Sequence, residues 1–405
     1  MHKIADVLAE HPEGLPPGEL ERLSGFSRST LNRRLREGVA NGTIIPQGKG
    51  AATRYFSADP LAAIRGYLDK PFTERKIAPY REEQLAIEPS IPPDKLAELS
   101  EANYQPLDKR HLSQFLIDFS CASSALEGST YSLLDTQSLI EYGEQNKGKP
   151  LKDAFLVLNH KEAFEYLYDH PQLDSIFNVH ALLTNDHELP ELADAEHFLS
   201  KRDRGVPREY SDINVKGSSY LPPFRPGTGY IGKTLNLVLD RAAQITDPVQ
   251  ASFYLFTRLP YLQPFRDGNK RTARAMCNAP LLQAGRPPIS FVDFEKRDYI
   301  ASTLAFYELG DTHLAEKCFV NAYLKSQERL LDVRERSSIV ASGQYSGKIL
   351  EIKNGLVQQK TGRGDEFVFH ELKRLSGKVA VGRIVDINYR DGIGQVLHKS
   401  LQVER

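Results

Sequence analysis

The sequence LQPFRDGNKRTAR, which ends at Arg274, concentrates residue types that bind phosphate groups. It places the carboxylate of Asp267 and the carboxamide of Asn269 beside three cations, Lys270, Arg271 and Arg274. These cations stand where a helix is expected to begin, and positive side chains at a helix N-terminus oppose the helix dipole unless an anion accompanies them. The segment therefore predicts an anion site, with a phosphate group as its natural ligand.

A helix is predicted from Asn269 to Gly285, and the loop QPFRDG leads into it. Arg271 and Arg274 are three residues apart, so they share one face of that helix. Gly268 lets the backbone approach a ligand closely, and Asp267 could hold a magnesium ion against the phosphates. The structural alternative is an Asp267 cap before a helix whose first turn is basic.

Composition limits the setting in which this site must work. The chain has 405 residues, of which 40% are hydrophobic and 26% are charged, as in a protein of two or three soluble domains. A net charge of −1 argues against a wholly basic nucleic-acid binder but leaves room for a local basic patch. Its three cysteines are far apart, and no apolar run is long enough for a membrane span, so we expect a cytoplasmic protein without disulfides.

Residues 1–60 have the pattern of a winged helix-turn-helix. The segments KIADVLAE, GELERLSG and SRSTLNRRLREGVANG predict three helices, and TIIPQGKGAATRYF predicts two short strands around a Gly-Lys-Gly turn. The third helix would face a DNA groove, and the hairpin would lie near phosphate. The DNA-facing residues would be Arg28, Ser29, Asn32 and Arg33 on the helix, with Lys49 and Arg54 on the hairpin. The alternative is a winged helix used only for protein contact.

Three further regions differ from this one in residue composition and hydrophobic periodicity. Residues 61–96 are rich in proline and predict an extended linker packed on a neighbour. Residues 97–332 carry apolar side chains at helical spacing and predict a mainly α domain, interrupted by SDINVKGSSYLPPF, which could form a short hairpin or flap. Residues 344–405 alternate with period two between NG and DG turns and predict a small antiparallel β-barrel or curled sheet of about five strands. This tail resembles small domains found in plasmid replication and mobilisation proteins.

The phosphate-binding segment resembles the signature of the Fic family, HxFx(D/E)GN(G/K)R followed by xxR. Here the signature runs from Gln263 to Arg271, with Arg274 as the second arginine, and the resemblance extends over roughly Leu107 to Leu324. It implies a helical fold that transfers AMP from ATP to a hydroxyl of a protein target; a Doc-like branch, with lysine after the asparagine, transfers phosphate. It implies nucleotide-binding roles for Gly268, Asn269, Lys270, Arg271 and Arg274, a Mg²⁺ ligand in Asp267, and catalytic positions at Gln263, Asp267, Asn269 and Arg271.

Two other segments resemble features of the same family. Ser123, Glu127 and Gly128 in SSALEG resemble its autoinhibitory motif, (S/T)xxxE(G/N). The resemblance implies a pair between Glu127 and Arg274 that blocks the seat of a γ-phosphate. The segment GSSYLPPF resembles the flap that holds a target by strand addition; the alternative is a mere surface hairpin. The flap residues are Gly217, Ser218, Ser219, Tyr220 and Leu221.

Gln263 stands where the family has the histidine that deprotonates the attacking hydroxyl. A carboxamide has no proton affinity to offer, and general-base help is commonly worth about 10²- to 10⁴-fold in rate. Lys270, in place of glycine, should crowd the phosphates and could invert the nucleotide. Three alternatives stay open: the protein binds a nucleotide without reacting it, transfers with a base from elsewhere, or uses the groove for another ligand.

A function of a different class also fits the sequence. The chain could be a DNA-bound regulator whose Fic-like fold is a non-enzymatic sensor or interaction module. The partners we expect are ATP or another nucleotide, a protein target and DNA; a homodimer is left open. A formal P-loop match, from Gly227 to Gly232, Lys233 and Thr234, lacks the buried strand that this motif requires before it.

Overall fold

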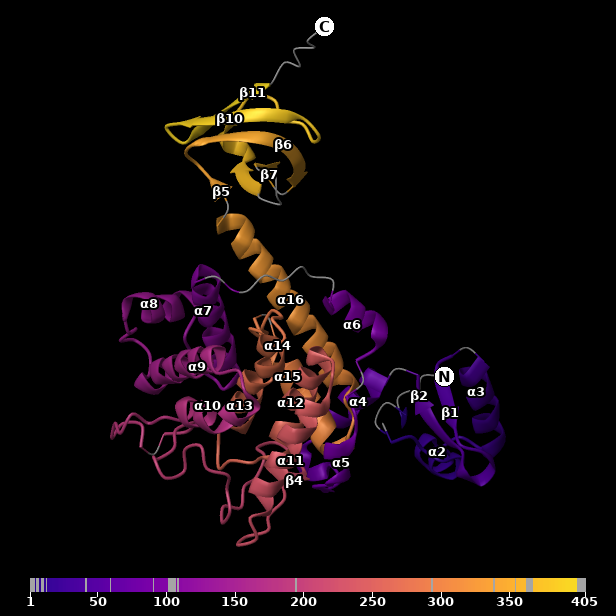
Figure 1. Ribbon diagram of the computed structural model, residues 1–405. Helices are drawn as coiled ribbons and strands as arrows, with labels where there is room; N and C mark the ends of the chain where they lie inside the picture. The colour runs from indigo at the N-terminus through magenta and orange to yellow at the C-terminus, as the bar shows by residue number, and fades with distance from the viewer. Residues whose placement is uncertain are drawn as a thin grey trace. The chain divides into compact units, whose positions relative to one another are not determined.

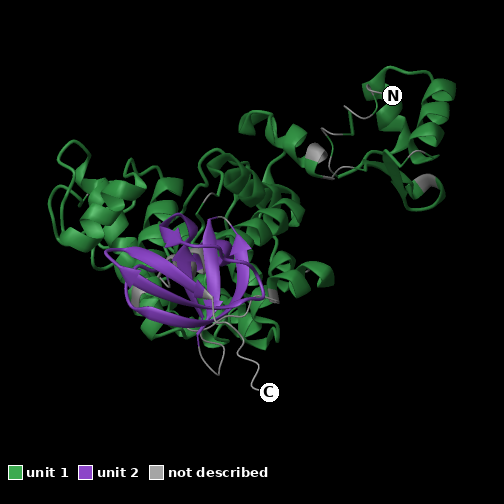
Figure 2. Cartoon of the chain, turned by 90° about the horizontal axis from the view of Figure 1, so that it is seen from above, with its two compact units in different colours: residues 1–326 green, residues 327–405 purple. Residues whose placement is uncertain are grey.

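The computed structural model describes most of the chain, which divides into two compact units, residues 1–326 and 327–405 (Figure 2). The described residues are 4–398 except 5–6, 9–10, 12, 41, 59, 90, 101–106, 108, 194, 293, 338, 354 and 362–366. Among the described residues, no helix is both long and apolar enough to cross a membrane. A finer division of unit 1 into winged helix, linker and Fic-like domain stays a prediction.

The N-terminal part of unit 1 is a small helical layer with a β-hairpin. Its elements are α2 (Pro17–Ser24), α3 (Arg28–Ala40), β1 (Ile44–Gln47) and β2 (Arg54–Ser57). The two strands are antiparallel, and a bridge from Leu15 to Tyr55 adds a third strand position. Gly38 permits α3 to approach the hairpin, because a Cβ built there would lie 2.5 Å from Ile44 Cδ1. Several residues of the predicted first helix, KIADVLAE, lie outside the described residues.

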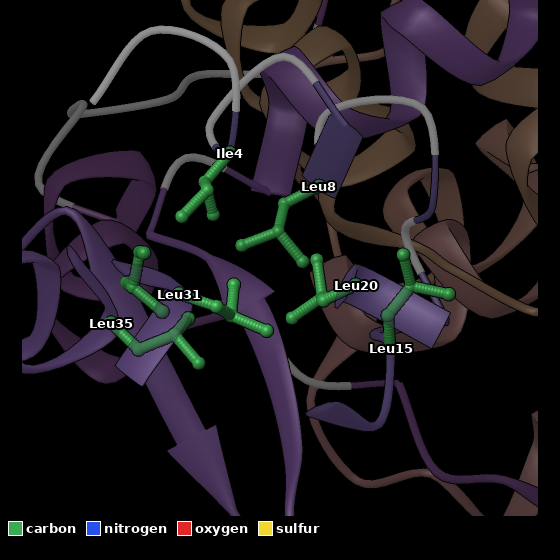
Figure 3. Close-up of a cluster of buried hydrophobic side chains, with 7 residues drawn as sticks. Ile4, Leu8, Leu15, Leu20, Leu31 and Leu35 are labelled. Atoms are coloured by element: carbon green, nitrogen blue, oxygen red, sulfur yellow. The ribbon is translucent and has the colours of Figure 1, made fainter. Parts of the chain in front are cut away.

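Seven leucine and isoleucine side chains from these elements form one core, and six are labelled in Figure 3. On α3 the buried positions are Leu31, Leu35 and Gly38, a spacing that gives the helix one inward face. The remaining face is polar and exposed. The winged-helix assignment remains a prediction that these elements are compatible with.

The linker is more helical than its prolines predict. It contains α4 (Pro60–Leu68), β3 (Ala78–Pro79), α5 (Glu83–Ala86) and α6 (Pro93–Ser100). The prediction of an extended segment is wrong for α4, α5 and α6; proline is tolerated at a helix start, as at Pro93, because the first N–H groups have no partner there. The part around β3 is extended.

The rest of unit 1 is mainly helical (Figure 1), and its last helix, α16 (His313–Ser337), continues past residue 326. The preceding helices in this part are α7 (Lys109–Leu126), α8 (Leu133–Tyr142), α9 (Leu151–Asp169), α10 (Ile176–Leu183), α11 (Tyr230–Gln244), α12 (Pro248–Leu262), α13 (Asn269–Met276), α14 (Asn278–Gln283) and α15 (Lys296–Leu304). Helix α12 is buried almost throughout and contacts α11, α13 and α14. It starts at an Asp247 cap, whose carboxylate accepts from the N–H groups of Val249 and Gln250.

Two sequence expectations for this region need correction. The single helix from Asn269 to Gly285 is divided at Cys277 into α13 and α14. Pro280 has no N–H to donate to the carbonyl one turn earlier. At the same break, the Asn278 side chain donates to the Arg274 carbonyl at 3.1 Å. The flap is not a hairpin: its strand β4 (Tyr220–Leu221) pairs in parallel with β3 of the linker.

A five-residue π-helix, η4 (Ala305–Leu309), follows α15 directly. It turns both Tyr307 and Glu308 into the interior, where each is buried. Single π-turns inside helices often occur at functional sites. Here the two neighbouring side chains reach different parts of the molecule, Tyr307 the end of α12 and Glu308 the flap.

Unit 2 is an open, seven-stranded sheet with the order β5-β8-β7-β6-β10-β11-β9. The strands are β5 (Ile339–Val340), β6 (Gln344–Lys353), β7 (Leu356–Lys360), β8 (Phe367–Glu371), β9 (Leu375–Ser376), β10 (Ile384–Arg390) and β11 (Ile393–His398). The four central pairings are antiparallel, and the two short edge strands pair in parallel. The predicted antiparallel barrel is therefore corrected to a mixed sheet, with no closing pair among the described strands.

Candidate active site

The candidate site is built around the motif loop, which we define as residues 263–268 between α12 and α13. Gln263 ends α12 in the left-handed region, with φ 52° and ψ 59°. Gly268 precedes α13 at φ 75°, and a Cβ there would lie 2.7 Å from Thr184 Cγ2 and 3.3 Å from His180 Nε2. Glycine is therefore required at residue 268 by both backbone conformation and space.

Asn269 and His180 hold the motif loop in shape. Asn269 Oδ1 accepts from Phe265 N at 2.8 Å, and its Nδ2 donates to Phe265 O at 2.8 Å. The His180 ring stacks on Phe265, with centroids 3.8 Å apart. His180 Nδ1 accepts from Gly205 N at 2.8 Å, so Nε2 carries the proton that is donated to Asp267 O at 3.0 Å. Burial lowers the pKa of His180 to about 4, although the bond to Asp267 opposes this shift.

Both ends of the Gln263 carboxamide form hydrogen bonds to residues around the motif loop. Its Nε2 donates to Pro260 O at 2.7 Å and to Tyr307 Oη at 3.2 Å, while its Oε1 accepts from Asn269 Nδ2 at 3.0 Å. Tyr307 in turn donates to Pro260 O at 2.6 Å, and burial raises the pKa of its phenol well above 10. Among the described residues, Gln263, His180 and Tyr307 are therefore all engaged in hydrogen bonds, and none of the three is free to act as a general base.

Arg274 is held by α7 and α15 through all three guanidinium nitrogens. Nε donates to Ser123 Oγ at 2.8 Å, and Nη2 donates to Ser123 O at 3.0 Å and to Glu127 Oε1 at 2.6 Å. Nη1 donates to Tyr299 Oη at 2.9 Å. The Arg274 side chain is 0% exposed and that of Glu127 is 16% exposed, so the ion pair is shielded from water.

Positive charge gathers around Glu127. Burial alone would raise the pKa of this carboxyl, but Arg274, then Arg271 and Lys270, lower it to about 2. Lys296, at the start of α15, also approaches: its Nζ lies 3.9 Å from where a Cβ on Gly128 would stand. Burial, with Arg274 and Lys296 nearby, lowers the pKa of Lys270. The end of α7 thus places one carboxylate inside a set of four cations.

Arg271 is turned toward the backbone instead of toward solvent. Its Nη1 donates to Leu183 O and its Nη2 to His197 O, both at 2.9 Å, and its Nε is buried without a partner among the described residues. Asp267 Oδ2 lies 3.7 Å from Arg271 Nη2, and Oδ1 accepts from Gly268 N. The Asp267 side chain is 44% exposed and can still reach a ligand.

The structure brings together most of the residues predicted for the site. Those that share it are Ser123, Glu127, Gly128, Gln263, Asp267, Gly268, Asn269, Lys270, Arg271 and Arg274. The described residues contain no group of three or more His, Cys, Asp or Glu side chains that could hold a metal ion. The assignment of Asp267 as a Mg²⁺ ligand stays a prediction.

Several residues of the site carry no signal in the sequence. Tyr299 and Lys296 come from α15, far along the chain, and Tyr307 comes from the π-helix. Arg208 is buried and joins the motif loop to the flap segment, donating to Gln263 O at 2.7 Å and to Pro223 O at 2.6 Å. Because none of these belongs to a motif or a periodic pattern, only the tertiary fold could reveal them.

The residues predicted to contact DNA lie elsewhere, on α3. Arg28, Ser29, Asn32 and Arg33 are all exposed. Arg28 pairs with Glu21 at 3.0 Å and Arg33 pairs with Glu37 at 3.3 Å, so both arginines have surface partners. On the hairpin, Lys49 is exposed, whereas Arg54 donates to Gly14 O at 2.7 Å.

The formal P-loop match is not a phosphate loop. Gly232, Lys233 and Thr234 lie within α11, and the strand that precedes them, β4, has only two residues, of which Leu221 is exposed. Helix α11 is an ordinary amphipathic helix whose inward face includes Thr234.

The site thus combines a loop, the helix that follows it and a buried ion pair between Arg274 and Glu127. A family model described as Fic/DOC family matches residues 166–281. The chain is 27% identical over 243 residues to the Protein adenylyltransferase Fic of Nematostella vectensis, which covers 57% of this chain and 52% of that protein. It is 26% identical over 200 residues to the Protein adenylyltransferase fic-1 of Caenorhabditis elegans, covering 46% and 35%. The chain therefore contains a Fic/DOC family domain.

Solved structures give similar partial matches. Fic-1 (residues 134–508) from C. elegans has a TM-score of 0.46 at 21% identity, covering 60% of this chain and 71% of that chain. A Fic family protein from Desulfovibrio desulfuricans has a TM-score of 0.46 at 18% identity, covering 64% and 82%. The chain spans about half the length, or less, of the curated relatives it matches. A second family model, described as KfrB Domain, matches residues 344–398.

Proposed function

We propose that the Fic/DOC domain binds ATP with Mg²⁺ and transfers AMP or phosphate to a protein hydroxyl, in an altered or weakened form. The observation that carries this proposal is the ion pair between Glu127 and Arg274, in which a carboxylate takes a place among the cations of α13 that a phosphate would otherwise fill. The names of the relatives, protein adenylyltransferases, support the reaction class.

Binding would exchange partners at this helix. When Glu127 withdraws, Lys270, Arg274 and Lys296 become available to phosphate oxygens, and the partnerless Nε of Arg271 can gain an acceptor. Asp267, still partly exposed, would contribute one oxygen to the magnesium that accompanies the nucleotide. In this arrangement Glu127 is an inhibitor because it competes with a phosphate for the same cation.

Transfer requires a proton to leave the acceptor. The hydroxyl oxygen forms a bond to phosphorus, the bond to the leaving pyrophosphate or ADP breaks, and the hydroxyl proton must go to a base. Gln263 cannot accept it, and its amide is already engaged three times. Because phosphoryl transfer depends mainly on positioning and charge neutralisation, slow transfer remains compatible with the loss of this base.

The test uses ATP labelled separately at the α and γ positions, with the wild type and with Glu127→Gly. Label on protein from the α position identifies AMP transfer, and label from the γ position identifies phosphate transfer. Glu144→Gly, which removes an exposed carboxylate outside the site, is the control. Absence of both transfer and an ATP-dependent rise in Tm in Glu127→Gly would reject the proposal.

The exposed polar face of α3 favours a second function, which we propose as an alternative: duplex DNA binding by the N-terminal region, with the Fic/DOC domain acting as a sensor or interaction module. The four side chains on this face are free of core contacts. Arg33→Ala should weaken duplex binding and reduce its salt dependence. Unchanged affinity would indicate that this face contacts protein or nothing at all.

A further inference from the structure

The strand edge of the flap is already occupied by the chain itself. Ala78 of β3 lies opposite Tyr220 of β4, and Pro79 lies opposite Leu221. Ala78 N donates to Ser219 O and Tyr80 N donates to Leu221 O, each at 3.0 Å. This is the alternating backbone pattern by which an extended peptide adds to a sheet edge.

Arg75, which precedes β3, is held by specific contacts to Glu308 and Gly217. Arg75 forms a 2.9 Å ion pair with Glu308 and also donates to Gly217 O at 2.7 Å. Glu308 further accepts from Ser218 Oγ and from Ser219 N, so one carboxylate binds the linker and the flap together. The Arg75 and Glu308 side chains are 5% and 0% exposed.

The other end of the segment is held by aromatic rings. The Tyr80 ring lies 5.4 Å from that of Tyr261 and 6.4 Å from that of Tyr230, and Ala78 between the two ends is buried. Ile77, in contrast, is 67% exposed. The surroundings of the segment thus favour an arginine at residue 75, a small residue at residue 78 and an aromatic residue at residue 80.

The flap has few other donors to offer. Ser218 N donates to Val215 O, Ser219 N to Glu308, and Tyr220 N to Ser218 Oγ. Pro222 and Pro223, which follow β4, have no N–H at all. A second peptide would therefore find fewer backbone partners on the opposite side of β4 than the linker finds on this one.

We propose that residues 75–80 of the linker act as a built-in competitor at the β4 edge, and that this edge selects its occupant by the pattern Arg-x-x-small-x-aromatic. A protein target that adds a strand there must displace residues 75–80. The inference deepens the proposed function, on which its relevance to targets rests, by assigning the partner chemistry of the flap. The linker competes at an effective concentration on the order of millimolar because it is tethered.

The test measures binding of a fluorescent peptide with the sequence of residues 71–82, PFTERKIAPYRE, to the full chain by anisotropy, without nucleotide. Ala78→Pro removes the N–H that is donated to Ser219 O and should raise the affinity for the peptide about tenfold or more. Ile77→Pro is the matched control, since Ile77 points outward and its N–H is not among the bonds to β4. A peptide with alanine in place of the arginine and tyrosine that correspond to Arg75 and Tyr80 should not bind.

Two outcomes would overturn the proposal. One is equal peptide binding by the wild type and Ala78→Pro; the other is no binding by an Ala78→Pro variant that keeps its circular dichroism and Tm. Should that variant fail to fold, hydrogen exchange in the wild type decides: the amides of Ala78 and Tyr80 must be protected relative to that of Ile77. Since no step uses ATP, peptide binding can succeed where nucleotide binding fails, and the reverse.

Discussion

Two parts of the site are held in different ways. Gln263, at the start of the motif loop, is held by hydrogen bonds between neutral groups, whereas Arg274, in α13, is held by an ion pair with Glu127. Gln263 bonds Pro260, Tyr307 and Asn269, all within or next to the loop. Arg274 instead bonds Ser123 and Glu127 of α7. The first arrangement fixes a shape, and the second can be exchanged for a ligand. Under the proposed function, binding at the helix is regulated by Glu127, whereas chemistry at the loop is weakened by Gln263.

Removing the cation should have the largest effect on the fold. Arg274→Ala leaves Glu127 buried among cations without its nearest partner and removes the bonds to Ser123, so the free energy of unfolding should fall by about 3–5 kcal/mol. Chemical denaturation measures this loss. The double variant Glu127→Ala, Arg274→Ala should lose less than the sum of the two single changes. Strict additivity would mean that the ion pair does not couple α7 to α13.

A second prediction concerns the motif loop, where a general base can be restored at residue 263. Gln263→His supplies an imidazole at the position where the sequence resemblance places one, and transfer from ATP should rise about 10²-fold in a Glu127→Gly background. Asp267→Ala in the same background should lose this gain, because the magnesium ligand is absent. A rate unchanged by Gln263→His would show that the acceptor or the nucleotide is not aligned with residue 263.

Much of this geometry could be predicted from the sequence, for a physical reason. Helical periodicity predicted a mainly helical region over residues 97–332, which α7, α9, α11 and α12 confirm. The cations at the start of α13 predict an anion site for a similar reason, because both patterns depend on neighbours along the chain. The contacts of Arg274 with Tyr299 and of Gln263 with Tyr307 join segments far apart in sequence, and no local pattern specifies them.

The flap is a second case in which a contact between distant segments could not be predicted from the sequence. Its prolines and glycine correctly indicated a non-helical segment, but the hairpin interpretation was wrong because the partner strand comes from the linker. A strand of two residues is too short to show an alternation of apolar and polar side chains, so the sequence does not indicate which strand it pairs with. The buried Arg75–Glu308 pair, which fixes that partner, spans more than two hundred residues and leaves no trace in local composition.

Releasing the restraint without removing the cation should have a moderate effect. Glu127→Gly frees Arg274 and lowers the negative charge near Lys270, so the affinity for ATP with Mg²⁺ should rise about tenfold, equivalent to about 1.4 kcal/mol. Isothermal titration calorimetry against wild type and Glu144→Gly measures it. Equal affinities in all three proteins would mean that Glu127 does not compete with the nucleotide.

Acidification within the mild range should have the smallest effect on the restraint. The pKa of Glu127 is lowered from 4.5 to about 2, so the stabilisation from its charge is fully present above 4.5 and is lost only as the pH falls through about 2. The ratio of ATP affinities between wild type and Glu127→Gln should therefore change by less than about twofold between pH 7 and pH 5. A ratio that converged toward one at pH 5 would show that Glu127 protonates in this range, and that the cations around it hold its charge less strongly than their positions imply.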